Sequence, residues 1–429
     1  MRALCLVGCA MLLGTYLQAQ QPLTPDQLGT APLTGEGAAY KNTMAYGVTS
    51  STAFDDNAPN LGNTVSNLTS SIQPNVSVSI DRPRSNAFLY YSPTYTYSSN
   101  VDAYNSASEA AAAKLEYRLS PRFSIQLKDA FSLTNNSFES LQAAGNLPPM
   151  GILDRPNTSV LGANLKSTTN QASADSIYRL GPHTSVGIGG TFATLQYQNP
   201  FGGANAGSIN SRSWSGRASY SQQLTPRYSF SVEYSTQNFS SQGLYSTLTH
   251  SVLGFWTVSL RQKIQFSVFG GPELSQFNDS LIAFSAVAVA KPSSTGFSGG
   301  GNLSWQGEHN GLTASFVQRV SDGGAGGGAA VDSRTASFGL QRRLSSRITT
   351  VLFANYVSNT QLDPLVAQPD FASVSGGVSV SRMMTPHWSV NLSASRQAFL
   401  GNTAQLIGQH DHDVATISIS YSFTRPIGR

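Results

Sequence analysis

Charged residues are scarce in this chain of 429 residues, since Asp, Glu, Lys and Arg make up only 11% of it. An average globular protein carries about 25%. Hydrophobic residues account for 40%, and the 17 Tyr, 21 Phe and 4 Trp are too many for a disordered tail. Small uncharged polar residues fill most of the remainder. This composition suits a sheet that is apolar on one face and moderately polar on the other.

The charges that are present form no basic block in the sequence. The net charge of +4 and the pI of about 9.0 come from scattered residues. Proteins that bind nucleic acids concentrate Lys and Arg on one face or stripe. We therefore expect no nucleic-acid partner.

Cysteine is almost absent, and both cysteines, Cys5 and Cys9, lie in a segment that resembles a secretory signal. Residues 1–19 begin with a basic residue, continue as an apolar stretch and end at a small-residue cleavage site. The mature chain is then free of thiols, which excludes disulfides and cysteine-ligated metals. An uncleaved anchor, or lipid attachment at Cys9, is the alternative.

Long hydrophobic runs are also missing. The apolar stretch of the signal is shorter than the roughly 20 residues that a transmembrane helix needs. No later run in the sequence reaches that length. If the mature chain enters a membrane, it must do so with strands.

A short turn motif recurs along the chain. An apolar residue is followed by Ser, Thr or Gly, then Pro, then Arg or His, and commonly an aromatic residue. Proline presets φ for the second position of a tight turn. Copies occur at residues 117–125, 178–186, 222–230 and 382–390, with looser copies at 342–348 and 260–264. Short turns also occur at 81–85 and 307–311, and longer polar connections at 199–210, 321–331 and 362–370. Short turns alternating with longer loops are typical of outer-membrane barrels.

The segments between these connections alternate with a period of two, as half-buried strands do. In residues 228–234, aromatic and branched residues alternate with Ser229, Ser231 and Glu233. The strands are about 9–14 residues long, which is longer than those of a soluble sandwich. Aromatic residues gather beside the turns, where an interfacial girdle would lie.

These patterns predict an all-β fold, a transmembrane antiparallel up-and-down β-barrel of about eighteen strands. An unpaired backbone group in hydrocarbon costs several kcal/mol, so the first strand, near 46–54, must pair with the last, at 414–423. The count falls to about sixteen if the first pair is not real. A secreted soluble β-protein is the alternative. The predicted domains are a signal peptide (1–19), a periplasmic lead-in or small plug (20–44) and the barrel (45–429).

The closing segment 417–423 alternates apolar and polar residues and ends in Phe423. It resembles the C-terminal signature of outer-membrane proteins, although six residues follow Phe423 here. The resemblance implies that Tyr421 and Phe423 form an insertion signal, that the barrel-assembly machinery is a partner, and that the protein lies in the cell outer membrane. The turn motif also resembles that of bacterial barrels from exopolysaccharide or exosortase-type systems, which implies export-system partners.

The chain offers little that could support catalysis. His410–Asp413 is its densest metal-capable cluster, but an extended strand presents only His410 and His412 on one side. We expect a solvated loop there. The sequence contains no Gly-x-Ser-x-Gly elbow between a strand and a helix. We therefore predict no metal, no cofactor and no enzymatic activity.

Inward-facing charges are the candidate functional residues, because rings of such groups tune which solutes pass a pore. Both signs occur, so weak ion selectivity is expected. We predict a channel for polar solutes or exported polysaccharide, in contact with outer-membrane lipid and narrowed by the connection 134–166. The alternative is a structural or surface-binding barrel with a filled lumen. By strand parity the lumen-lining residues are Lys114, Glu116, Arg118, Asp175, Arg179, Arg217 and Glu233.

Overall fold

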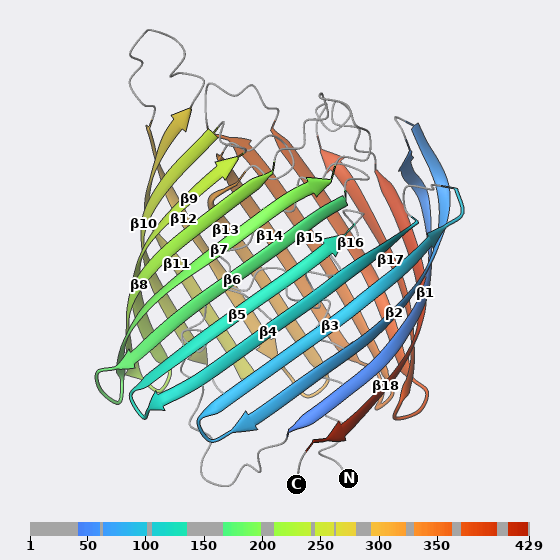
Figure 1. Ribbon diagram of the computed structural model, residues 1–429, viewed down its shortest axis with the longest axis horizontal. Coiled ribbons are helices and arrows are strands. Elements are labelled where there is room, and N and C mark those ends of the chain that lie inside the picture. The colour runs from blue at the N-terminus through green and yellow to red at the C-terminus, as the bar shows by residue number, and fades with distance from the viewer. Residues whose placement is uncertain are drawn as a thin grey trace.

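Alternation of bulky and small polar side chains favours extended backbone along almost the whole chain, and strands account for the architecture (Figure 1). The computed structural model describes residues 42–427 apart from 61–62, 101–104, 135–165, 199–209, 242–244, 261–262, 280–292, 323–329, 363–369 and 401–410. In these ranges no helix has the length and apolar character needed to cross a bilayer.

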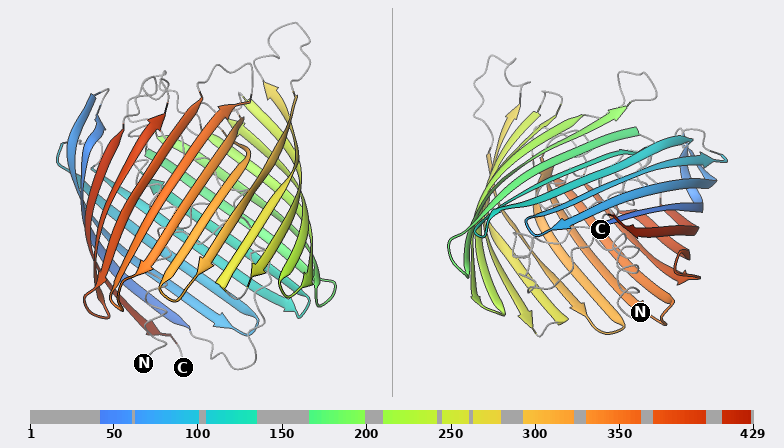
Figure 2. Two further views of the ribbon diagram at one scale, coloured as in Figure 1. Left: turned by 180° about the vertical axis from the view of Figure 1, so that it is seen from behind. Right: turned by 60° about the horizontal axis from the view of Figure 1, so that its bottom comes forward.

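The strands run obliquely across the wall (Figures 1 and 2). They are β1 (Thr43–Asn60), β2 (Asn63–Arg82), β3 (Ser85–Ser98), β4 (Ser106–Ser120), β5 (Phe123–Thr134), β6 (Lys166–Arg179), β7 (Thr184–Gln198), β8 (Ser211–Thr225), β9 (Tyr228–Ser241), β10 (Tyr245–Leu260), β11 (Ile264–Asp279), β12 (Ser293–Gln306), β13 (Asn310–Asp322), β14 (Ala330–Arg343), β15 (Ile348–Gln361), β16 (Phe371–Met383), β17 (Trp388–Leu400) and β18 (His412–Pro426).

The sheet closes into a barrel because β1 pairs antiparallel with β2 on one side and with β18 on the other. At this seam Tyr46 lies opposite Phe423, and Phe54 lies opposite Ala415. Every other strand pairs with its neighbours in the sequence. The predicted eighteen-strand barrel is confirmed. The sixteen-strand alternative is wrong, because β1 and β2 are both paired members of the wall.

Several strands exceed the predicted length, since β1 has 18 residues and β2 has 20. A tilted strand needs only about 9–11 residues to cross hydrocarbon, so the extra residues extend the wall beyond the membrane. Proline within β2 interrupts the ladder locally. The β2–β3 pairing skips from Ile72 to Val76 around Pro74, whose carbonyl accepts a 3.0 Å hydrogen bond from the Ser92 hydroxyl.

The connections between an even-numbered strand and the next odd-numbered one all lie at one end of the barrel and are each two to four residues long. This includes every copy of the repeated motif. The register Thr43↔Pro426 places the start of β1 and the end of β18 at that end as well. In outer-membrane barrels the short turns face the periplasm. We call the end of the barrel that carries these turns the turn rim.

Several predictions fall on residues that the structure does not describe. These are the signal peptide 1–19, the lead-in 20–44 except for its last three residues, nearly all of the constricting connection 134–166, and His410 of the His–Asp cluster. The boundaries proposed for the signal peptide and the lead-in stay predictions.

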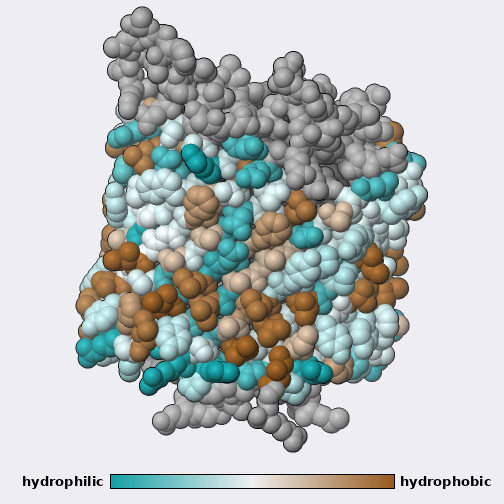
Figure 3. Space-filling model, in the orientation of Figure 1, coloured by the Kyte–Doolittle hydropathy of each residue, from teal (hydrophilic) through white to brown (hydrophobic). Residues whose placement is uncertain are grey.

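The outer surface carries the bulky side chains. In Figure 3, apolar residues gather on the half of the β2–β8 face that is nearer the turn rim. The half farther from the turn rim is more hydrophilic. Exposed aromatic residues next to the turns include Tyr117, Tyr178 and Trp388, with 43–47% of their surface accessible. A band of this kind, edged by aromatic rings, matches the hydrocarbon and interfacial layers of a bilayer.

Candidate functional site

The inner face of the wall is polar. On β9, Val232 and Tyr234 are 37% and 46% exposed on the outside, whereas Ser231 and Glu233, which alternate with them, are each 1% exposed. The same alternation runs along the other strands, because successive side chains of a strand point to opposite faces. Inward side chains are therefore identified by their alternation with exposed apolar ones.

The seven residues predicted to line the lumen all lie on this inward face. Each alternates with an outward aromatic residue on its own strand, such as Tyr117 on β4, Tyr178 on β6 or Tyr220 on β8. Their part in solute selection stays a prediction. They are Lys114, Glu116 and Arg118 on β4, Asp175 and Arg179 on β6, Arg217 on β8, and Glu233 on β9.

The structure joins two of these residues directly. Arg217 Nη2 lies 2.5 Å from Asp175 Oδ1, and Arg217 Nε donates to the same oxygen at 3.1 Å. The strand between them, β7, presents Gly189 at this level. A Cβ added to Gly189 would overlap Asp175 Oδ1 and lie 3.1 Å from Arg217 Nε. Glycine thus leaves the space through which the ion pair spans β7.

A weaker pair lies on β4, where Arg118 Nη2 is 3.7 Å from Glu116 Oε1. Their side chains are 41% and 24% exposed, so solvent screens the attraction and the pair adds little stability. Lys114 lies directly opposite Lys128 of β5, on the same inward face. Like charges in such a cross-strand position are unfavourable. The sequence analysis missed Lys128, although the β4–β5 turn aligns it with Lys114.

The wall turns sharply where the green strands give way to the yellow ones in the right-hand view of Figure 2. Inward side chains of β8–β13 pack together there, and we call this packed region the inner corner. Four apolar side chains form its centre, with Leu253 and Val317 each 1% exposed. The rings of Phe255 and Phe269 stack at 5.3 Å.

Charged residues lie against this apolar centre. Glu233 from β9, Glu273 from β11 and Arg319 from β13 are 1%, 5% and 8% exposed and line one recess with Arg217. The Ser298 hydroxyl donates to Glu273 Oε2. Buried charges are tolerated only where they are paired and hydrogen-bonded. The sequence analysis identified Glu233 but missed Glu273 and Arg319, because only the curvature of the wall brings their strands together.

Glycines make the inner corner possible. A Cβ on Gly271 would overlap the carbonyl oxygen of Val252 on the neighbouring strand. A Cβ on Gly300 would overlap the carbonyl oxygen of Phe316 and crowd the Phe269 ring at 2.9 Å. Close approach of backbones is a normal reason for glycine inside a strand.

The predicted insertion signal lies in β18 at the turn rim. The ring of Phe423 lies 5.3 Å from that of Tyr46 across the seam, and the ring of Tyr421 lies 5.1 Å from that of Trp388 on β17. Both residues therefore belong to the aromatic girdle of the folded barrel. Their recognition by the assembly machinery stays a prediction.

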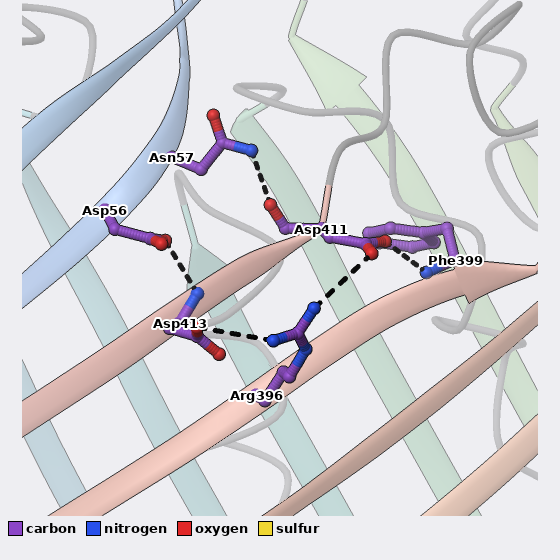
Figure 4. Close-up of polar contacts among 6 residues, drawn as sticks. All are labelled: Asp56, Asn57, Arg396, Phe399, Asp411 and Asp413. Atoms are coloured by element: carbon purple, nitrogen blue, oxygen red, sulfur yellow. Dashed lines mark hydrogen bonds and ion pairs between the residues drawn. The ribbon is translucent and has the colours of Figure 1, made fainter.

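Polar contacts tie the opposite end of the seam (Figure 4). Asp56 Oδ1 accepts a 2.7 Å hydrogen bond from the Asp413 amide, and the Asn57 side chain donates to the Asp411 carbonyl oxygen. Arg396 of β17 lies 3.6 Å from Asp413 Oδ2 and 4.0 Å from Asp411 Oδ2. Asp411 and Asp413, part of the sequence cluster considered for metal binding, instead hold β1, β17 and β18 together. Within the described part of the chain, no three His, Cys, Asp or Glu residues are grouped to hold a metal ion.

No protein-family model matches the chain, and no curated protein matches its sequence. Solved structures similar to it include the outer membrane protein OpdK from Pseudomonas aeruginosa, at 12% identity, covering 89% of this chain and 99% of that one, with a TM-score of 0.45. OccAB4 from Acinetobacter baumannii is 9% identical over 90% and 98% of the two chains (TM-score 0.44), and a BenF-like porin from Pseudomonas fluorescens Pf-5 is 10% identical over 89% and 99% (TM-score 0.48).

The class of the protein follows from the barrel itself. Eighteen antiparallel strands close with apolar side chains outside and polar side chains inside. In hydrocarbon only a closed sheet can satisfy all of its backbone groups. The protein is a transmembrane β-barrel, which is the fold of bacterial outer-membrane proteins. The resemblance to barrels of exopolysaccharide or exosortase-type systems finds no support in the comparisons.

Proposed function

We propose that the protein is a passive channel for small polar solutes across the outer membrane. The observation that carries this proposal is the polar inner face outside the inner corner. There the inward side chains of β17, such as Asn391 and Gln397, stay partly exposed. Barrels of sixteen to eighteen strands enclose an aqueous lumen that wall side chains cannot fill. Water and polar solutes therefore have a path along this part of the wall.

Charges of both signs line this path, so the channel discriminates weakly between cations and anions. Lys114 and Lys128 place two positive charges side by side on the inner face, whereas Glu233 and Glu273 place negative charges in the inner corner. The two glutamates are buried in the inner corner, whereas Lys114 is partly exposed. Accessible fixed charge attracts counter-ions. A mild preference for anions follows.

Planar-bilayer recordings of the purified protein test the proposal. We expect stable single-channel currents and, under a KCl gradient, a reversal potential that indicates mild anion preference. Lys114→Gln should move that potential toward cation preference. Arg396→Gln, which removes an exposed charge from the outer face, is the matched control and should leave it unchanged. An insulating protein that is folded and inserted would contradict the channel.

A structural or surface-binding barrel with a filled lumen is the second candidate. The inner corner favours it, because side chains such as Leu253 and Phe269 already fill the interior along six strands. The two candidates differ in permeability. A filled lumen predicts no current and no uptake of small polar solutes by liposomes that contain the protein.

Two finer expectations from the sequence also belong here. We infer a non-enzymatic role, since the inward residues described above suit passage better than bond cleavage. Export of polysaccharide through the same lumen is the other expectation, and no contact among the described residues favours it. Swelling of proteoliposomes in small sugars, compared with polysaccharide of increasing size, separates the two passengers.

A further inference from the structure

The repeated turn has a feature that solute passage does not explain. Seven of the turns carry a basic residue whose backbone carbonyl accepts a hydrogen bond of 2.7–2.9 Å from the adjacent hairpin. The Arg118 amide, for example, donates to Arg84, and the Arg179 amide donates to Arg122. The basic residues so placed are Arg84, Arg122, His183, Arg227, His309, Arg347 and His387. Successive turns are thereby linked around the rim, with one basic side chain at each.

The hydroxyl of the motif holds this residue in place. Ser120 Oγ accepts hydrogen bonds from the amides of Arg122 and Phe123, at 3.3 and 3.1 Å. Thr225 accepts from Arg227 and Tyr228, Ser345 from Arg347 and Ile348, and Thr385 from His387 and Trp388, each at 3.1–3.3 Å. A hydroxyl that closes a turn in this way replaces a backbone contact. The same pair of hydrogen bonds therefore holds the basic position in four separate turns.

The turn rim is strongly positive. Its charges are counted over the described residues within 81–86, 117–123, 178–184, 222–228, 259–264, 305–310, 341–348, 382–388 and 424–426. In these segments Asp81 and Glu308 are the carboxylates. The Lys and Arg residues number twelve: Arg82, Arg84, Arg118, Arg122, Arg179, Arg227, Lys263, Arg342, Arg343, Arg347, Arg382 and Arg425. The rest of the chain must therefore be acidic on balance, since its net charge is only +4.

The depth of this ring matches that of lipid headgroups. Aromatic residues next to the turns, such as Tyr228 and Trp388, belong to the interfacial girdle. Arg382 lies on the same face of β16 as the exposed Val378 and Val380. Arg425 lies on the same face of β18 as the exposed Ile417 and Ile419, so both side chains leave the barrel on its lipid side. A long basic side chain at that level extends toward the membrane surface.

From these observations we propose that the basic residues of the turn rim, apart from the lumen-facing Arg118 and Arg179, bind the phosphate groups of anionic phospholipids in the inner leaflet of the outer membrane; we call them the basic ring. Two properties identify the partner. A phosphate has the opposite charge, and a lipid phosphate beside the aromatic girdle lies at the same depth in the membrane as the basic residues. Because the turns are regularly spaced, each hairpin can present a basic side chain to a lipid phosphate. The proposal depends on the barrel fold and not on solute passage.

The test compares lipid binding by the detergent-solubilised full chain. Fluorescent phosphatidylglycerol and fluorescent phosphatidylcholine are titrated in turn, and the variant R84Q/R122Q/R227Q/R347Q is compared with R84K/R122K/R227K/R347K. We expect the wild type to prefer phosphatidylglycerol, and the glutamine variant to bind it about fivefold more weakly at each site. The lysine variant should keep its preference, because it keeps the charge.

Further arms exclude other sources of the effect. Inorganic phosphate at equal concentration should not displace the lipid, whereas displacement would mean a site for free phosphate and would overturn the proposal. Equal binding of both lipids by the wild type, or unchanged preference in the glutamine variant, would also overturn it. If the glutamine variant does not fold, the salt dependence of phosphatidylglycerol binding to the wild type tests the proposal instead. Raising NaCl from about 50 to about 500 mM must weaken phosphatidylglycerol binding to the wild type.

Discussion

Asp175 on β6 and Arg217 on β8 form an ion pair across β7 because Gly189 on β7 has no side chain to separate them. The closest atoms lie 2.5 Å apart, and both side chains are less than 15% exposed. Three residues on three strands thus form one unit of the inner wall. Their coupling leads to two predictions that need no assumption about transport.

Gly189→Ala should destabilise the barrel by about 1–3 kcal/mol, because the added methyl group displaces the carboxylate and the guanidinium together. Urea unfolding in lipid vesicles, followed by tryptophan fluorescence, measures the change. Gly216→Ala on β8 is the matched control, since its new Cβ would meet its nearest neighbour, Thr236 Cγ2, at an ordinary 3.7 Å. A loss of stability as large in the control would show that glycine substitution itself, and not the ion pair, is responsible.

Arg217→Gln should cost about 3–5 kcal/mol, because it leaves a largely buried carboxylate with a weaker partner. Replacing Asp175 with Asn in the same chain should recover part of that loss. A double-mutant cycle on the unfolding free energies isolates the coupling between the two side chains. If the effects of the two substitutions on the unfolding free energy were strictly additive, the interaction between the two side chains would contribute nothing to stability.

The sequence was sufficient for the strand pattern and for closure. Period-two alternation and the repeated turn mark where strands start and stop, and the cost of open edges in hydrocarbon requires β1 to meet β18. The alternation of side chains along each strand was also enough to place Arg217 and Asp175 on the inner face of the wall. These features are local, or follow from a single physical requirement, and can therefore be found in one sequence.

The inner corner could not be found in this way. Glu233 and Arg319 are separated by 86 positions and by the three strands β10–β12, and they line one recess only because the wall bends there. That bend depends on how closely backbones approach at Gly271 and Gly300, which composition does not reveal. A glycine inside a strand pattern marks a bulge or a close approach without saying which strand approaches.

Phe269→Ala should destabilise the barrel by about 3–5 kcal/mol, because it leaves a cavity beside Phe255 in a region with little freedom to collapse. Phe266→Ala on the same strand removes a ring that is 40% exposed on the outer face. Lipid can fill the space that this control leaves, so its effect should be clearly smaller. Unfolding midpoints in urea compare the two variants. Equal losses would mean that the inner corner is not tightly packed.

Phe423 has two possible roles, in the packing of the seam and in recognition during assembly, and a pair of variants separates them. Phe423→Ala and Tyr46→Ala each abolish the same ring contact of 5.3 Å across β1 and β18, and Phe423→Ala also removes a ring contact of 5.6 Å with His387. Only the first alters the closing strand that the assembly machinery is predicted to bind. We expect Phe423→Ala to reduce the heat-modifiable barrel in outer-membrane fractions severalfold more than Tyr46→Ala does, while both variants refold from urea with similar stability. Similar losses in the cell would assign Phe423 to seam packing alone, since removal of the contact would then explain the whole effect.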